Sequence, residues 1–216
     1  LPSKATFDRS LEDAVHFAVL PQIARRRPER ILLVSPEPAA FPVLGSWPLV
    51  ALRCGQEADS DPVACDTVAL PFRDDVFDAV LLHHVFADGR EPELDEAWRV
   101  LSGGGDLFVL GQGSLGWPLR DYRRRQCWPG LRVRQVCQRL RQRAFVIQNC
   151  IGSGILGVGV QCTQRWQRPM LPFADTVVIH GRHRPLKPIV RPLRFGRPQT
   201  VGVRSAAADS LYRKAV

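Results

Sequence analysis

Two adjacent histidines and an acidic residue stand where chemistry could take place. His83 and His84 directly follow the apolar run Ala79–Leu82, and Asp66 with Thr67 precedes a Leu-Pro-Phe turn. A histidine at the end of a buried strand can act as a base or contact a ligand, and a carboxylate on a turn accepts hydrogen bonds. The alternative for the histidines is structural, with one ring packed in a sheet and the other at its mouth.

The elements that would position these residues form a strand, a helix and a second strand. The run Ala79–Leu82 is the first strand, and a helix with apolar residues at helical spacing ends at Leu101. Three glycines, Gly103 to Gly105, are expected to cap that helix and lead into the strand Leu107–Leu110. This unit belongs to parallel sheets, which bind ligands at the carboxyl ends of their strands.

The segment 65–110 resembles the second half of a class I S-adenosylmethionine-dependent methyltransferase domain, of the type 11 kind. The matching residues follow the family's order: Asp66, Leu70-Pro71-Phe72, Asp74, Phe77-Asp78, Val80, Glu96, Arg99-Val100-Leu101 and Gly104-Gly105. Val76 and Gly103 stand where the family usually has Ser and Pro. The close match covers about a fifth of the chain, and a looser one extends from Ile31 to His180.

The resemblance implies an α/β, Rossmann-like methyltransferase fold with a mostly parallel seven-stranded sheet and helices on both faces. The strand of Ile31 should lie beside that of Ala79, and the last two strands should form an antiparallel hairpin. The apolar runs expected as strands are 31–34, 49–52, 67–70, 79–82, 107–110, 145–150 and 176–180. Helices are expected at 10–24, with Ser10 as N-cap, and at 131–144.

S-adenosylmethionine is the cofactor that the resemblance implies. The family holds it with a glycine-rich loop after the first strand, an acid after the second and an Asp before the Leu-Pro-Phe turn. Carried onto this chain, the cofactor-binding residues are Ser35, Glu37, Glu57, Asp66, Thr67 and His83. The catalytic residues stay unassigned, with His83 and His84 as candidates, and we expect no metal.

The first two of these contacts depart from the family pattern. Residues 35–40 contain two prolines and no glycine, so side chains would occupy the space that close backbone approach requires. Arg53 follows the second strand, and Glu57 or Asp59 would have to reach back. Only 14 residues separate Val34 from Leu49, so the crossover should contain short helices or loops.

Composition indicates a globular protein without a membrane span. The chain has 216 residues, of which 45% are hydrophobic and 24% charged, and no apolar run reaches the length of a spanning helix. Six cysteines form no Cys-x-x-Cys pair, so neither a zinc site nor a disulfide framework is expected. The run 25–27 of three arginines follows the first apolar stretch, which does not fit a signal peptide. We expect a cytoplasmic protein with reduced thiols.

Nearly all of the net charge of +9 lies in residues 182–216, which hold nine basic residues and one acid. Four prolines there favour an extended chain, so we expect a methyltransferase-like domain at 1–181 and a basic Pro/Arg-rich tail at 182–216. Apolar residues alternate with the arginines, which favours binding to a protein partner or to the chain's own domain. RNA is the alternative partner. A second arginine-rich stretch with aromatic residues, 120–128, could contact phosphates or be a solvated helix face.

Three functions remain open on the sequence alone. The first is an active S-adenosylmethionine-dependent methyltransferase of unknown acceptor. The second is a catalytically inactive methyltransferase-like subunit, a pseudoenzyme that serves assembly or protein interaction, and the missing glycines motivate it. The third is an RNA-binding platform.

Overall fold

The computed structural model describes residues 4–54, 66–85, 92–114, 130–154 and 170–184. They lie within one compact unit, Leu1–Leu186. Residues 185–216 of the predicted tail, Glu57, Asp59 and the stretch 120–128 fall outside these ranges, so those predictions stay predictions. Arg182 and His183, the first residues of that predicted tail, belong to the last strand of the sheet. In the described part, none of the helices has the length and apolarity that crossing a membrane requires.

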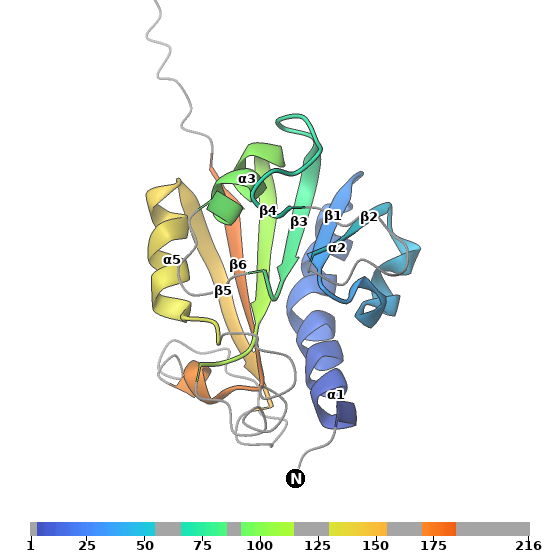
Figure 1. The fold of residues 1–216 in the computed structure, drawn as a ribbon, viewed down its shortest axis with the longest axis vertical. Coiled ribbons are helices and arrows are strands. Elements are labelled where there is room, and N and C mark those ends of the chain that lie inside the picture. Colours follow the sequence, from blue (N-terminus) through green and yellow to red (C-terminus); the bar gives the residue numbers. More distant parts are fainter. Residues whose placement is uncertain (1–3, 55–65, 86–91, 115–129, 155–169, 185–216) are drawn as a thin grey trace, which may run out of the picture. The chain divides into compact units, whose positions relative to one another are not determined.

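Six strands form one sheet in the order β2-β1-β3-β4-β6-β5 (Figure 1). Their bounds are β1 Ile31–Ser35, β2 Leu49–Arg53, β3 Phe77–His83, β4 Leu101–Gly111, β5 Phe145–Ser153 and β6 Thr176–His183. The first four are mutually parallel, whereas β6 runs antiparallel to both β4 and β5. Ile31 pairs with Ala79, so the expected adjacency of the first and fourth apolar runs is confirmed. The antiparallel hairpin is confirmed as well.

Helices cover both faces of the sheet, as expected (Figure 1). One face is covered by a continuous helical stretch made of α1 Lys4–Ala14, a π-helical turn Val15–Val19 and α2 Leu20–Arg26. The other face is covered by α3 Pro92–Val100 and α5 Val133–Gln142. Each layer packs its apolar side chains on the sheet, and β1, β3 and β4 are buried on both sides, as central parallel strands are.

The expected strand at 67–70 is wrong, because this segment is a turn. The Asp66 carboxylate accepts the N–H of Val68 at 3.0 Å, and the Asp66 carbonyl accepts the N–H of Ala69 at 3.2 Å. Glu96 takes the N–H of Leu70 at 3.1 Å. With these donors satisfied by local and side-chain acceptors, the backbone has no need of a strand partner. The described sheet therefore has six strands rather than seven.

Two expectations about helix ends are also wrong. Ser10 lies inside α1, where its hydroxyl donates to Thr176 Oγ1 at 3.3 Å instead of capping a helix. The three glycines lie inside β4, which begins directly after α3 ends at Val100. The pairing of β3 with β4 jumps from Phe77–Leu101 to Ala79–Asp106, so the glycines form an irregular bulge in the strand.

Candidate functional site

The carboxyl ends of β1, β2 and β3 meet at one edge of the sheet. Ser35 ends β1 and pairs with Arg53, the last residue of β2. On the other side, Val34 pairs with Leu82, which brings Ser35 next to His83. The chain places β2 on one side of β1 and β3 on the other. Open α/β sheets bind ligands at such a switch point in the strand order.

Ser35 is at the centre of a closed hydrogen-bond network. Its Oγ lies 2.9 Å from Nδ1 of His83, and the same oxygen accepts the N–H of Glu37 at 3.1 Å. The Ser35 carbonyl accepts the N–H of Cys54 at 3.1 Å. Ser35 itself is 0% exposed, so its hydroxyl holds the strand ends together and cannot act on a substrate. The exposed Glu37 contributes its backbone N–H to this network.

His83 is buried between two aromatic rings. The Phe41 ring meets it edge-on with centroids 4.9 Å apart, and the His84 ring lies 4.2 Å away. Burial, followed by the neighbouring His84, holds the pKa of His83 well below its ordinary value of 6.5. The ring is therefore neutral at physiological pH, and each nitrogen can accept or donate one hydrogen bond.

His84 is the more accessible of the two histidines. Its backbone is left-handed, with φ of 52°, and its N–H donates to the carbonyl of Leu110 at 3.0 Å. Burial lowers the pKa of His84 to about 3, although part of its surface stays accessible. An imidazole with this pKa is a weak base, poorly matched to removing a proton at neutral pH. The structure thus brings both predicted histidines to the edge and keeps both uncharged.

The connection between β1 and β2 contains two short 3-10 helices, Pro38–Ala40 and Pro42–Ser46, in place of an α-helix. Short helices were expected from the length of this gap. Phe41 lies between them and is buried, 4% exposed, against the core. The glycine of this connection, Gly45, has nothing within 4 Å of an added Cβ, so it does not mark a close backbone approach.

Asp66 and Thr67 lie on the turn that replaces the expected strand. Asp66 is exposed, and its Oδ1 is occupied by the Val68 N–H, which leaves Oδ2 directed to no described partner. Thr67 is half-buried. A carboxylate oxygen on an exposed turn can accept an amino group of a ligand.

A charged cluster on α3, which the sequence interpretation did not assign, fixes this turn. Arg99 donates to the carbonyls of Leu70 and Phe72 at 3.1 and 2.8 Å, to Asp74 at 2.6 Å and to Glu96 at 2.7 Å. The hydrogen bonds that Arg99 donates hold the pKa of Glu96 below its ordinary value. Because Glu96 and Asp74 accept these bonds, they raise the pKa of Arg99. The i, i+3 spacing of Glu96 and Arg99 was the signal that could have revealed the pair.

The residues at the carboxyl edge fit the adenine end of S-adenosylmethionine better than its methionine end. The exposed Asp66 carboxylate suits the amino group of an adenine. At the end of β1, in contrast, the backbone and hydroxyl of Ser35 are engaged by Glu37, Cys54 and His83, and no glycine in 35–40 lets a ligand approach. The described residues do not form the glycine cradle expected for the methionine end.

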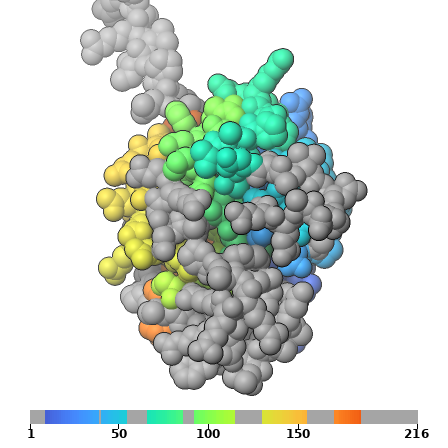
Figure 2. Space-filling model, viewed as in Figure 1, coloured from blue at the N-terminus to red at the C-terminus, as the bar shows by residue number. Residues whose placement is uncertain are grey.

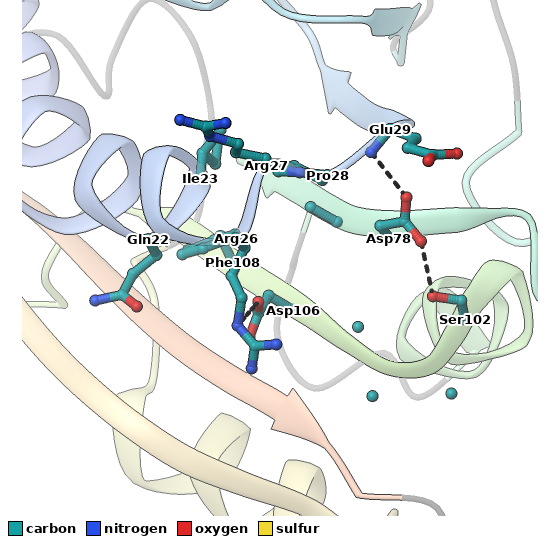
Figure 3. Close-up of a pocket in the computed structure, with 14 residues that line it drawn as sticks. Gln22, Ile23, Arg26, Arg27, Pro28, Glu29, Asp78, Ser102, Asp106 and Phe108 are labelled. Atoms are coloured by element: carbon teal, nitrogen blue, oxygen red, sulfur yellow. Dashed lines mark hydrogen bonds and ion pairs between the residues drawn. The ribbon is translucent and has the colours of Figure 1, made fainter.

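A cavity of about 450 Å³ lies at the opposite, amino-terminal edge of the strands (Figure 3). Asp78 holds that edge together, because its carboxylate accepts the N–H groups of Glu29 and Arg30 at 2.9 and 3.3 Å and the hydroxyl of Ser102 at 3.3 Å. Asp78 therefore has a structural role at this edge. Asp106, on the same wall, lies 3.0 Å from Nε2 of the buried His180. This cavity shares no residue with the carboxyl edge.

A family model described as "Methyltransferase domain" matches residues 47–109, less than a third of the chain. Similar solved structures include a possible histamine N-methyltransferase from Thermotoga maritima, at 16% identity and TM-score 0.54, covering 84% of this chain and 100% of that one. A putative sarcosine dimethylglycine methyltransferase from Galdieria sulphuraria shares 9% identity at TM-score 0.54, covering 80% and 85%. This is a class I methyltransferase fold.

The same fold occurs in an S-adenosylmethionine-dependent methyltransferase from Archaeoglobus fulgidus, at 11% identity and TM-score 0.51, covering 80% of this chain and 98% of that one. None of the curated proteins matches the chain. The resemblance to class I methyltransferases that the sequence indicated is confirmed, and the structural likeness at these identities concerns the fold.

Proposed function

We propose that this methyltransferase-fold protein is an S-adenosylmethionine-dependent methyltransferase, with its acceptor left unassigned. The observation that carries the proposal is the switch point at which the ends of β1 and β3 meet, marked by the 2.9 Å contact of Ser35 and His83. Ligands of parallel sheets bind outside such a point. The match of residues 47–109 to a methyltransferase domain supports the same function.

In this proposal Asp66 accepts the adenine amino group, and Arg99 keeps the turn of Asp66 in place through the carbonyls of Leu70 and Phe72. The cofactor, when bound, supplies a methyl group already activated on its sulfonium. The protein then has mainly to hold donor and acceptor in line. His84, neutral with a pKa of about 3, would contact the ligand as an uncharged ring and would not remove a proton at neutral pH.

The test is calorimetric titration of the full chain with S-adenosylhomocysteine, with Asp66→Asn as the variant. Asparagine keeps an oxygen for the Val68 N–H but presents an amide donor where adenine needs an acceptor. We expect binding to weaken by about 1–3 kcal/mol, the scale of a hydrogen bond to a charged group. The exposed Glu12, on α1, supplies the control Glu12→Gln, which should bind like the native protein. Equal affinity in native protein and Asp66→Asn would contradict the placement.

A second candidate function is a catalytically inactive domain that serves assembly. The observation that favours it is the closed network around Ser35, together with the Phe41 ring packed on His83. Titration with 5′-methylthioadenosine, which lacks the amino-acid part, separates the two functions. The methyltransferase proposal predicts binding of both ligands, whereas the inactive domain binds neither.

For the basic segment 182–216 we propose a protein partner, since apolar residues alternate with its bases. Truncation after Arg184 leaves β6 intact, which ends at His183. We expect the truncated chain to lose its partner in a pull-down. Loss of salt-sensitive RNA binding with the pull-down unchanged would favour RNA instead.

A further inference from the structure

A cavity of about 860 Å³ lies between α5 and β5, the strand at the edge of the sheet. In Figure 2 these two elements form the yellow surface along one side of the molecule. β4 and β6 separate β5 from β3, the strand that ends at His83, so this cavity belongs to a different part of the sheet. The volume lies in the range of small-molecule sites.

The charged residues among the described lining of this cavity are all basic. Its described lining includes Arg132, Arg134 and Arg141 and contains no carboxylate. Arg134 and Arg141 lie seven residues apart on α5 and therefore on the same face of the helix, and both are exposed. Arg143, just beyond the helix, differs from them because Asp95 accepts a hydrogen bond from it. Arg134 and Arg141 thus form a positive wall.

The remaining wall is largely apolar. Val133, Ile147 and Leu171 line it, from α5, from β5 and from the segment before β6. Cys137 and Cys150 face each other across the helix–strand contact, with their sulfurs 3.8 Å apart. Gln135 and Gln138 supply amide groups from the helix. A ligand that matches this lining has an apolar body and a negatively charged group.

We propose that the cavity beside α5 binds a small amphipathic anion, with its carboxylate or phosphate on Arg134 and Arg141 and its apolar body against Ile147 and Leu171. Arginine suits both anions, because its planar group donates two parallel hydrogen bonds to their oxygens. The site is concave and partly apolar, which favours a small molecule over an acidic protein. This site is independent of the cofactor proposed at the carboxyl edge.

The first experiment measures binding of octanoate, octyl phosphate and octanol to the full chain by calorimetry. The proposal expects one or both anions to bind and octanol to bind far more weakly, because the arginines select the charged group. Octanoate and octyl phosphate distinguish a carboxylate ligand from a phosphate ligand. Binding of octanol as tight as that of both anions would overturn the proposal, as would binding of none of the three.

The second experiment uses the double variant Arg134→Gln with Arg141→Gln. We expect the preferred anion to bind at least about tenfold more weakly, since hydrogen bonds to a charged group are lost. The matched control is Arg9→Gln with Arg25→Gln, two exposed arginines on α1 and α2 with the same change in net charge. Equal weakening in both double variants would show general charge attraction and overturn the site.

Alkylation locates the ligand without any substitution. Cys150 lines the cavity and is half-buried, whereas the half-buried Cys54 follows β2 near the opposite edge of the sheet. The bound anion should slow the reaction of Cys150 with iodoacetamide and leave Cys54 unchanged, as read by peptide mass mapping. Unchanged Cys150 under saturating anion would overturn the proposal. Displacement of the anion by polyglutamate at low salt, without protection of Cys150, would reassign the surface to an acidic protein.

Discussion

The hydroxyl of Ser35 and Nδ1 of His83 lie 2.9 Å apart and join the ends of β1 and β3 inside the protein. Both residues are almost fully buried, at 0% and 2% exposed. A serine beside a histidine is a pattern of nucleophilic catalysis, but a hydroxyl without access to solvent cannot meet a substrate. The pair therefore has a structural role at the edge of the sheet where we place the ligand.

The substitution Ser35→Ala should destabilise the fold. It removes this hydrogen bond of His83 and the acceptor of the Glu37 N–H, and we expect a loss of roughly 1–3 kcal/mol in the free energy of unfolding. Urea denaturation monitored by circular dichroism measures it. Ser46, exposed at the end of a 3-10 helix, provides the control Ser46→Ala, with a change within about 0.5 kcal/mol. Similar losses in the two variants would show that the contact contributes little.

The contact of Glu96 with Arg99 should make the stability of the fold depend on pH. Hydrogen bonds from Arg99 lower the pKa of Glu96 from its ordinary value of 4.5, so the folded protein favours the ionised carboxylate. This contribution is fully present above pH 4.5 and is lost as the pH falls through the folded-state value. Glu96→Gln should therefore be less stable than the native protein at pH 7, by roughly 1–3 kcal/mol, with the difference shrinking below pH 4.5.

Urea denaturation across a pH series tests this dependence. Glu12, which is exposed on α1, supplies Glu12→Gln as the control, and its stability should follow that of the native protein at every pH. A difference between native protein and Glu96→Gln that stays constant down to pH 3 would contradict the assigned cause.

The sequence predicted the elements whose signal is a continuous apolar run. β1 and β2 extend one residue beyond the expected runs, and β3 extends by two residues at its start and one at its end. It failed at 67–70, where the residues are apolar enough for a strand but their N–H groups are taken by Asp66 and Glu96. The Glu96 contact comes from tertiary structure, which propensity does not contain, whereas the Asp66 contact is a local turn that competes with a strand.

The candidate site was predictable in part for the same reason. The positions of Ser35, Asp66 and His83 followed from where strands and turns end. The burial of Phe41 against His83 did not, because it depends on how a loop of prolines folds back on the sheet. The cavity beside α5 needed the structure as well, since only the packing of α5 on β5 brings Arg134 near Ile147.

The buried Asp175 should make stability depend on pH in the opposite direction from Glu96. Burial raises the pKa of Asp175 from 3.8 to about 6, so the folded protein favours the protonated form. Between these two values the folded state binds more protons than the unfolded state, and stability falls as the pH rises from about 4 to about 6. Asp175→Asn should remove this loss and be more stable than the native protein at pH 7, by about 1–3 kcal/mol.

Urea denaturation at pH 4 and pH 7 tests that sign. The gain from Asp175→Asn should be present at pH 7 and small at pH 4. The exposed Asp95 of α3 is unsuitable as a control because it pairs with Arg143, so Asp75→Asn serves, at an exposed turn. A loss of stability in Asp175→Asn at pH 7 would mean that the charged carboxylate is the stabilising form.

Two glycines of the chain should respond oppositely to alanine. A Cβ on Gly113, just after β4, would lie 2.3 Å from the carbonyl oxygen of Ala174 and 2.7 Å from that of Pro172. Both are backbone atoms, so the segment before β6 would have to move as a whole. We expect Gly113→Ala to cost about 1–3 kcal/mol or more in the free energy of unfolding. The contacts on Gly113 include its own N–H bond to Ala174 at 3.1 Å, which that movement would also break.

Gly45, between β1 and β2, is the matched control, because an added Cβ there meets nothing within 4 Å. Gly45→Ala restricts the unfolded chain without a clash, so it should be neutral or gain about 0.4–1 kcal/mol. Thermal and urea denaturation of both variants compare them directly. If Gly113→Ala kept native stability, the segment before β6 would not pack on the end of β4 as described. Leu171 and Pro172 would then not line the cavity beside α5 in this way.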